Sequence, residues 1–583
     1  MHDIDDDTIA AGTAVVHGAA TGDVLASTTE LSLWGGVDPA TGVVIDSHHP
    51  LHGRSLTGRV LVIPGGRGSC SGSGVLLELL LNGHGPAALV LARADEILTL
   101  GVVVAEEVFG CSLPVVVLGA DAFKRVRTAP HVRVAGHRVL KADPNRSAAE
   151  PSTNARADAP TDLPLALTPR DRAILEGAHG RAAQVAMRVV LRMSALQGAT
   201  ELIDVTRAHI DGCIYTGPGG LRFAEQLRAW GGRVAVPTTL NAISVDYRHW
   251  RDQGVDTALG EPASRLGDAY VAMGAEATFT CAPYQLDAPP GAGEQIAWAE
   301  SNAVVHANSV LGAHTLKYPD YLDICIALTG RAPLAGCHLP TNRRAQVRVS
   351  LPPLDGLDDA FFPLLGYHVG RIAGHRIPAI TGLAHTAPTA DDLKALSAAF
   401  ATTSSAPMYH LVGLTREAVT LEQAGGGTAP DETVDVDLEA LRASWHGLNG
   451  AEAEPIHLVS LGNPHFSPAE CARLAALCRG RRKHPDVRVI VTLGRAMHER
   501  ARAAGSIAEL EAFGVQFVTD TCWCMIQEPL IPPGTTTIMT NSAKYAHYGP
   551  GLTGCAFRFA SLADCVEAAC TGYAHDRLPA WLA

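Results

Sequence analysis

Reactive side chains occur in two kinds of surroundings in this 583-residue sequence, and the first is a glycine-rich turn. Residues 64–74, PGGRGSCSGSG, follow an apolar segment at 60–63 and precede another at 75–81. A turn of this kind between a strand and a helix exposes backbone N–H groups at the positive end of the helix. A serine there can meet an anion, and its alkoxide form is stabilised, as a catalytic base requires. A plain turn with a serine that caps the helix explains the same pattern.

The second kind of surroundings is a short polar loop that contains cysteine. Cys281 lies in residues 280–284, TCAPY, and Cys522 and Cys524 lie in residues 520–524, DTCWC, after an apolar segment. A C-x-C pair supplies soft thiolates of the kind that iron or zinc prefers. No second cysteine or histidine pair stands nearby to complete a zinc finger, so a ligand role needs cysteines from distant loops. The alternative is that these, like most of the 13 cysteines, are small buried hydrophobes.

Three further segments concentrate hydrogen-bonding side chains among apolar residues. They are 298–315, with WAESN, ANS and GAHT; 461–470, LGNPHFSPAE; and 540–550, TNSAKYAHYGP, which reads as a loop. Buried polar groups need partners, so these side chains either satisfy one another or face a small polar substrate. In the second segment, Ser467 and Glu470 fit a capping box that opens a helix, which leaves a site role open for the preceding polar residues.

The elements that must position these residues indicate a compact α/β unit near the N-terminus. We assign residues 1–145 to a small domain that contains the serine turn. Short apolar runs bounded by Gly or Pro predict strands, and longer runs between them predict helices. The expected strands are 59–63, 87–91 and 114–117, and the expected helices are 75–82 and 100–107.

A change of composition separates this unit from the rest of the chain. Residues 146–167 are rich in Pro, Ala, Asp and Ser and lack periodicity, so we assign them to a linker. Residues 168–583 then form a large domain in which helices, buried strands and Gly/Pro loops alternate. A helix is expected to start at residues 168–169 and continue through 176–191, and a surface loop or junction is expected at 425–450.

Bulk composition excludes several classes of protein. The formal net charge is −13, the pI is about 6.0 and no basic stripe stands out, so we expect no nucleic-acid partner. The acidic N-terminus lacks the apolar core of a signal peptide, and no apolar run approaches the roughly 18 residues of a membrane span. An odd number of cysteines argues against a disulfide framework. We therefore expect a cytoplasmic protein that acts on a small molecule, with its oligomeric state left open.

Several long motifs occur together in the order of one family. The sequence resembles aconitase X over nearly its whole length, and residues 30–120 are similar to the small, swivelling subunit of that family. The motifs similar to its large subunit are EGAHG at 176–180, VPTTLN at 236–241, TCAPY at 280–284, ESN at 300–302 and NSAKY at 541–545. The resemblance implies an α/β protein in which a small swivelling β/α domain is fused to a large aconitase-like domain of several subdomains.

The resemblance also implies an activity, because aconitase X enzymes are dehydratases. Fused bacterial members act on cis-3-hydroxy-L-proline, and two-chain archaeal members act on mevalonate 5-phosphate. A fused chain therefore implies a hydro-lyase that makes Δ1-pyrroline-2-carboxylate through an enamine, with another small hydroxy acid, such as mevalonate 5-phosphate, as the alternative substrate. The net charge disfavours an RNA-binding regulator, and the intact serine turn disfavours an inactive metal-binding scaffold.

Stereochemistry constrains how such a site must be built. In cis-3-hydroxy-L-proline the hydroxyl and carboxylate share one ring face, and the α-hydrogen lies on the other, so elimination is anti. A base for the α-proton and a Lewis acid for the leaving hydroxide must then lie on opposite sides of the substrate. By analogy with the serine on the swivelling domain of aconitases, Ser69 is the expected base and Ser71 its nearest competitor, with Lys544 as a further catalytic residue. The expected substrate contacts are Gly68, Ser71, Asn302, Ser309, Tyr545 and His547.

The resemblance places a metal centre on cysteines of the large domain. Cys281 and Cys522 carry over by motif as ligands. Archaeal members have a cysteine in the Gly-x-Pro-His motif, whereas this chain has Asn463 there. A [2Fe–2S] cluster or mononuclear iron is therefore expected in place of a standard four-iron cluster. The third ligand is left open between Asn463, through its oxygen, and Cys524 or Cys555.

Overall fold

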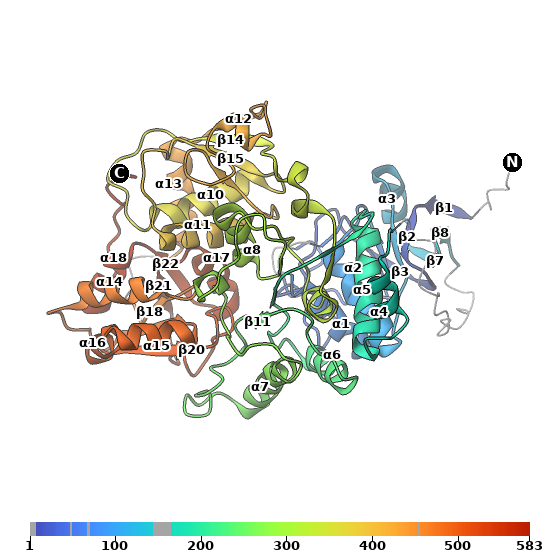
Figure 1. Ribbon diagram of the computed structural model, residues 1–583, viewed down its shortest axis with the longest axis horizontal. Coiled ribbons are helices and arrows are strands. Elements are labelled where there is room, and N and C mark those ends of the chain that lie inside the picture. Colours follow the sequence, from blue (N-terminus) through green and yellow to red (C-terminus); the bar gives the residue numbers. More distant parts are fainter. Residues whose placement is uncertain (1–6, 47–48, 67–69, 144–164, 452–454) are drawn as a thin grey trace.

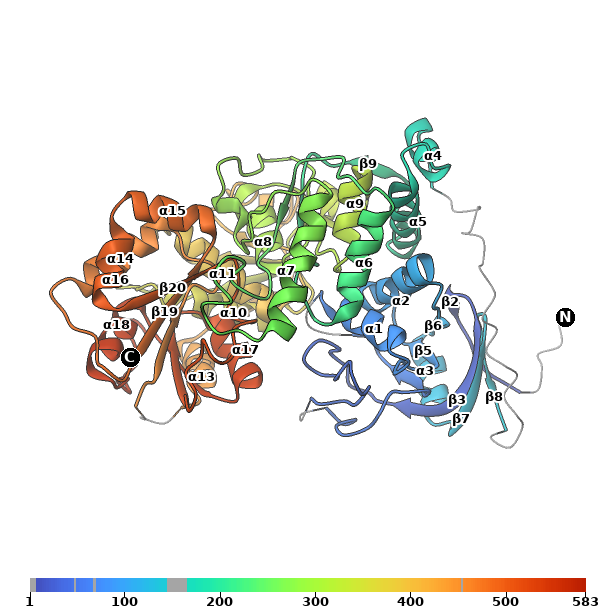
Figure 2. The ribbon, with the colours of Figure 1, turned by 90° about the horizontal axis from the view of Figure 1, so that it is seen from below.

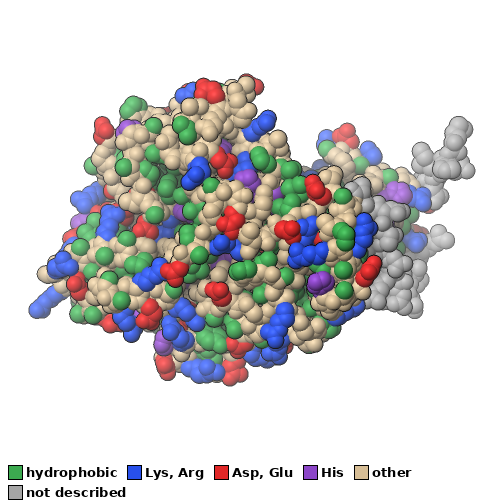
Figure 3. All heavy atoms as spheres, in the orientation of Figure 1, with side chains coloured by type: hydrophobic (Ala, Val, Ile, Leu, Met, Phe, Trp, Pro, Cys, Tyr) green, Lys and Arg blue, Asp and Glu red, His purple; other side chains and the backbone are tan. Residues whose placement is uncertain are grey.

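The computed structural model describes residues 7–46, 49–66, 70–143, 165–451 and 455–583 (Figure 1). Figures 1 and 2 both place a central region between the N-terminal domain and the C-terminal part of the chain. Within the described residues, no helix combines the length and the apolar character that spanning a bilayer requires. On the face drawn in Figure 3, cationic and anionic side chains are interspersed, without a continuous basic stripe.

The N-terminal domain is built on one eight-stranded sheet in the order β1-β8-β7-β3-β4-β5-β6-β2. Its strands are β1 (Thr8–Ala11), β2 (Thr13–Val16), β3 (Ala19–Ala26), β4 (Val60–Ile63), β5 (Ala88–Leu91), β6 (Val115–Val117), β7 (His131–Ala135) and β8 (Arg138–Lys141). Its helices are α1 (Gly72–Leu81), α2 (Glu96–Phe109) and α3 (Ala120–Arg127). Strands β3 to β6 run parallel, and both their faces are buried: Leu61 faces the core that α1 and α2 share, and Val62 faces α3. The three expected strands and two expected helices are confirmed within a few residues.

The central region has a short parallel sheet in the order β11-β10-β12 and a separate pair, β13-β9. Its strands are β9 (Leu202–Asp204), β10 (Ala208–Ile210), β11 (Thr238–Leu240), β12 (Ala297–Trp298) and β13 (Arg331–Pro333). Its helices are α4 (Pro169–Leu175), α5 (Arg181–Leu196), α6 (Pro218–Ala229), α7 (Thr257–Ala272), α8 (Ser301–His306) and α9 (Leu322–Thr329), with a π-helical turn at Ala307–Leu311. Because β10, β11 and β12 are parallel, the residues that follow them share one edge.

Two further parallel sheets complete the chain. The first, β16-β15-β14-β17, comprises β14 (Val347–Ser350), β15 (Pro378–Thr381), β16 (His410–Leu411) and β17 (Thr433–Asp435), with α10 (Phe361–Ala373), α11 (Ala390–Thr403), α12 (Leu421–Ala424) and α13 (Leu438–Leu448). The second, β20-β19-β18-β21-β22, comprises β18 (Leu458–Leu461), β19 (Arg488–Leu493), β20 (Val515–Thr519), β21 (Thr537–Thr540) and β22 (Ala556–Phe559). Its helices are α14 (Pro468–Cys478), α15 (Arg495–Ala503), α16 (Ser506–Phe513), α17 (Ala543–Thr553) and α18 (Leu562–Thr571). The carboxyl ends of parallel strands, where ligands bind in open α/β sheets, therefore gather residues from distant segments.

The N-terminal domain packs on the central region through α1 and α2. One hydrophobic core contains Leu76 and Val103 of these helices together with Met187 of α5. On the same side, Arg192 of α5 forms an ion pair with Glu106 at 3.0 Å. The two regions are thus joined by shared burial as well as by the chain.

Three expected elements differ from those observed. Residues 176–180 are not helical, because Gly177 and Gly180 adopt positive φ angles of +94° and +89° and end one helix before the next begins. Residues 425–450 are not one surface loop, since they contain β17 and α13. Residues 543–550 belong to helix α17 even though Pro550 lies inside it, because Ser542 caps its N-terminus by accepting a hydrogen bond from Tyr545 N.

Candidate active site

Loops from two regions bring cysteine thiols together at the carboxyl edge of the C-terminal sheet. Cys522 and Cys524 follow β20 directly, whereas Cys281 comes from the central region, just before a 3-10 turn at Pro283–Gln285. Hydrogen bonds from Cys281 and Cys524 hold the pKa of Cys522 well below its usual value. The same contacts, together with burial, raise the pKa of Cys281 and of Cys524. Cys522 is therefore the thiol of this group that most readily loses its proton, and the thiolate is the form that binds metals.

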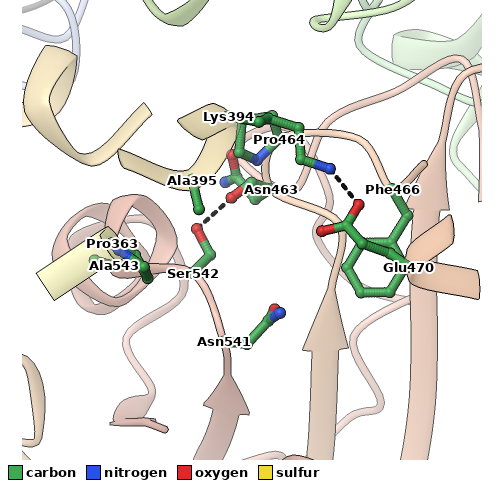
Figure 4. Close-up of a pocket in the computed structure, with 10 residues that line it drawn as sticks. All are labelled: Pro363, Lys394, Ala395, Asn463, Pro464, Phe466, Glu470, Asn541, Ser542 and Ala543. Carbon is green, nitrogen blue, oxygen red and sulfur yellow. Dashed lines mark hydrogen bonds and ion pairs between the residues drawn. The ribbon is translucent and has the colours of Figure 1, made fainter. Parts of the chain in front are cut away.

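Asn463 lies beside this group, two residues beyond the end of β18. Its Oδ1 is 3.9 Å from Cys522 Sγ, and its Nδ2 is 3.6 Å from Cys524 Sγ. Its backbone carbonyl accepts a hydrogen bond from Ser542 Oγ, as Figure 4 shows. The N-cap residue of α17 therefore fixes the turn that presents the Asn463 amide to the cysteines.

A buried ion pair adjoins the cysteines. Lys544, in the first turn of α17, lies 3.1 Å from Glu300, the N-cap residue of α8. Burial acts to lower the pKa of Lys544, but Glu300 and the cysteines outweigh burial and hold this pKa well above its usual value. Lys544 is therefore a permanent cation that offsets negative charge on the sulfurs and has further N–H donors for an anionic substrate.

Tyr548 lies one helical turn after Lys544, so both side chains lie on the same side of α17. Burial raises the pKa of Tyr548 to about 12. Its titratable neighbours are the Lys544–Glu300 ion pair and the thiols of Cys524 and, from the N-terminal domain, Cys70. The phenol is therefore neutral, and groups of both domains lie near it.

The serine turn of the N-terminal domain meets the central region at the same place. Ser69 and Gly68 lie outside the described residues, but Cys70 and Ser71 directly after them are buried. Ser71 precedes α1 without forming a side-chain cap, and its hydroxyl forms a hydrogen bond with Asp320. The charged neighbours of Cys70 include Lys317, Asp320 and Glu300. Cys70 thus lies near Glu300, a member of the buried ion pair, from the opposite domain.

Acidic side chains of the central region line this junction. Asp320 forms hydrogen bonds with both Ser71 and Asp211, the residue that follows β10. Burial and the nearby Asp323 raise the pKa of Asp320 to about 7, and burial raises the pKa of Asp211 as well. Two carboxyl groups so close share a proton near neutral pH, because both cannot be charged in a buried place.

Comparison with known proteins identifies the architecture. Aconitase X family models match four successive stretches: the swivel domain at residues 9–141, the first domain at 164–341, the second at 344–446 and the third at 456–571. The chain belongs to the aconitase X family.

Curated relatives of this aconitase X chain cover nearly all of it. It is 58% identical to the cis-3-hydroxy-L-proline dehydratase of Hypocrea jecorina, over 98% of this chain and 97% of the relative. It is also 58% identical to the cis-3-hydroxy-L-proline dehydratase of Pseudomonas aeruginosa, over 97% of each chain. The phosphomevalonate dehydratase large subunit of Methanothermobacter thermautotrophicus is 35% identical over 65% of this chain and 92% of that subunit.

A solved structure agrees with the fold. The holo-form of Thermococcus kodakaraensis aconitase X matches with a TM-score of 0.62 at 30% sequence identity, over 70% of this chain and 100% of that chain. The expected fold class, a swivelling domain fused to a larger α/β domain, is thereby confirmed.

Within the aconitase X site, several expected substrate contacts have internal partners. Asn302 donates to Cys281 O at 2.9 Å and to Glu300, and accepts from Tyr284 at 2.8 Å, so it supports the cysteine loop. Ser309 lies in the π-helical turn, where its hydroxyl accepts from Tyr409 N at 2.9 Å. The structure therefore gives both residues positioning contacts.

Three other expected site residues lie away from the cysteine group: Tyr545, His547 and Cys555. The ring of Tyr545 is fully buried against Trp523, behind the C-x-C segment. His547 is exposed, and its Nδ1 lies 3.4 Å from Tyr367. Cys555 precedes β22 at the amino edge of the sheet and donates to Thr535 O at 3.1 Å. The structure thus does not bring Cys555 to the expected metal ligands, whereas it does bring Cys524.

The sequence interpretation missed Tyr548 and the Asp211–Asp320 pair. Helical spacing from Lys544 points to Tyr548, but this signal is lost when 540–550 is read as a loop. No local pattern marks the two aspartates, because they come together only where β10 and the segment before α9 meet.

Proposed function

We propose that this chain is a cis-3-hydroxy-L-proline dehydratase, which eliminates water to give an enamine that tautomerises to Δ1-pyrroline-2-carboxylate. The observation that carries the proposal is 58% identity, over almost the full length of both chains, to curated proteins of that name. Anti elimination needs a base and a Lewis acid on opposite ring faces. Support for this arrangement is that Cys70 and Ser71, directly after Ser69, and the cysteine group belong to different domains.

Within this proposal, Ser69 is the base that takes the α-proton. Its position lies outside the described residues, and its support is the placement of Cys70 and Ser71 beside Asp320 and Glu300. The Asp211–Asp320 pair can accept and return a proton near neutral pH, since it already shares one. Lys544 binds the substrate carboxylate, and Tyr548 donates a hydrogen bond on the same side.

The donor set fits an iron or iron–sulfur centre. In the described part of the chain, no group of three or more His, Cys, Asp or Glu side chains is arranged so that it could hold a metal ion without movement. Even so, Cys281 and Cys524 both contact Cys522 and lower its pKa, and soft thiolates select such centres. These three cysteines would hold the metal, with Asn463 as a weaker oxygen donor. Bound iron supplies the Lewis acid for the leaving hydroxide.

Three finer assignments belong to the same proposal. A [2Fe–2S] cluster is favoured, with mononuclear iron as the alternative, over a standard four-iron cluster, because Asn463 stands where archaeal members have a cysteine. The substrate is a free small molecule, with no nucleic-acid or membrane partner. All 13 cysteines have free thiols, which suits the reducing cytoplasm.

The test is a comparison of substrates with anaerobically purified protein. Turnover of cis-3-hydroxy-L-proline with formation of Δ1-pyrroline-2-carboxylate supports the proposal. Turnover of mevalonate 5-phosphate in its place refutes the substrate. Iron and sulfide content and the visible spectrum, measured on the same preparation, decide between the two kinds of centre.

A further inference from the structure

His465 connects the three loops that carry the proposed ligands. Its side chain is fully buried, two residues after Asn463. Its Nδ1 lies 3.2 Å from Thr280 Oγ1, its Nε2 lies 2.7 Å from Thr521 O, and its backbone N–H donates to Cys281 Sγ at 3.4 Å. Thr280 precedes Cys281 and Thr521 precedes Cys522. One imidazole therefore touches both cysteine loops from the loop of Asn463.

These contacts fix the tautomer of the ring. A carbonyl oxygen only accepts, so the proton must be on Nε2, which donates to Thr521 O. Nδ1 is then the acceptor, and Thr280 donates its hydroxyl hydrogen to it. The same Thr280 oxygen accepts from Ala282 N at 3.1 Å. A directed chain of hydrogen bonds thus runs from the Cys281 loop through the imidazole to the Cys522 loop.

A buried ammonium holds the backbone of the same residue. Lys394 of α11 donates to His465 O at 3.2 Å and is ion-paired with Glu470 of α14, as Figure 4 shows for the ion pair. A second carboxylate, Asp391, lies 3.0 Å from the ammonium. The backbone of His465 is therefore held by helix α11 as well as by its own loop.

We propose that His465 is the positioning residue that keeps the Cys281, Cys522 and Asn463 loops in register for the metal centre, with Lys394 fixing its backbone. This inference rests on the proposed iron centre. Hydrogen bonds behind metal ligands orient those ligands, and their loss lowers metal affinity by about 10- to 100-fold. Because His465 reaches two cysteine loops, each of its ring nitrogens controls a different ligand.

Two substitutions at His465 separate the contact with Thr280 from the contact with Thr521. His465→Gln keeps a side-chain N–H at the reach of Nε2 but offers Thr280 no acceptor. His465→Asn keeps an acceptor at the reach of Nδ1 but no longer reaches Thr521 O. We expect both variants to release iron to a chelator about tenfold faster or more than the unmodified protein, measured anaerobically together with iron per chain and thermal unfolding.

Thr280→Val provides the decisive comparison. It removes the hydroxyl that binds Nδ1, so it should speed iron release much more in the His465→Asn background, where that link survives, than in the His465→Gln background. Its effect on Ala282 N is the same in both backgrounds and cancels. Equal increments would overturn the inference.

A matched control is His410→Gln. His410 is also buried, and its Nε2 contacts Arg343 O at 2.7 Å, far along the chain from the ligand loops. Iron release should be unchanged there, even if the melting temperature falls. If the His465 variants also keep iron as long as the unmodified protein, His465 is only a core residue.

The two proposals fail in distinguishable ways. Unmodified protein that takes up no iron overturns the centre itself. Active, iron-loaded protein whose His465 variants release iron normally overturns only the positioning role. If His465→Gln does not fold, His465→Asn decides the matter through the contact with Thr521 O, since faster iron release supports the positioning role and an unchanged rate refutes it.

Discussion

The role of Lys544 can be tested by removing its charge with Lys544→Met. A hydrogen bond to a charged group contributes about 1.5–3 kcal/mol, and about 1.4 kcal/mol corresponds to a tenfold change in affinity. Loss of the contact to the substrate carboxylate should therefore weaken binding by roughly 10- to 150-fold. L-Proline, which lacks the leaving hydroxyl, is a non-reacting ligand for calorimetry, and L-prolinol lacks the carboxylate.

The variant should lose affinity for L-proline while binding L-prolinol as before. The ammonium also pairs with Glu300, whose side chain is only 7% exposed, and removing one member of a buried pair costs about 3–5 kcal/mol of stability. Two hydrogen bonds to Glu300, from Asn302 and from Ala303 N at 2.9 Å, reduce that cost. The double variant Lys544→Met/Glu300→Gln should recover the stability but not the L-proline affinity.

A matched surface control is Lys124→Met, because Lys124 is 70% exposed on α3 and should change neither quantity. Equal losses for L-proline and L-prolinol would refute the reasoning, since they would mean that the site had collapsed. Unchanged L-proline affinity would refute it too, because the carboxylate would then bind elsewhere.

Three further predictions concern the base, the ligands and the domain junction. Ser69→Ala should abolish turnover while iron content stays normal; near-normal activity would exclude this serine as the base. Cys522→Ser should lose bound iron, whereas Cys555→Ser should keep it, as metal analysis of both purified proteins will show; the reverse pattern would move the centre to the other edge of the sheet. Asp320 keeps its proton in the folded protein up to a pKa of about 7 but ionises near 3.8 when unfolded, so its contribution to stability is complete below about pH 4 and is lost as the pH rises to about 7. Asp320→Asn should flatten the pH dependence of the unfolding midpoint in that window, and an unchanged slope would contradict the raised pKa.

The sequence predicts well those elements whose boundaries are marked by residues close in the chain. The strand at 60–63 is an apolar run bounded by Gly and Pro, and the capping box of Ser467 and Glu470 opens α14 as expected. It predicts poorly where tertiary contacts override local signals. Pro550 suggests a loop, but α17 packs between α10 and α11 on one side and β22 on the other, and it persists through the proline.

The same distinction applies to the candidate site. Cys281 and Cys522 can be predicted because cysteine in a polar loop is unusual, and Cys524 can be predicted because it forms a C-x-C pair with Cys522. The partnership of Asp320 with Ser71 depends on how the N-terminal domain docks, which no periodicity encodes. His465 was one polar residue in a turn, and its reach to two distant loops follows only from the fold.

The core that α1, α2 and α5 share has a consequence for how this enzyme is assembled. Since apolar burial and the Arg192–Glu106 ion pair already hold the N-terminal domain against the central region, the covalent connection is not what keeps the halves together. A protease cut between residues 144 and 164 should leave two fragments that still co-purify. Fusing the halves instead fixes their stoichiometry, because each chain carries one serine-bearing domain for each cysteine-bearing region.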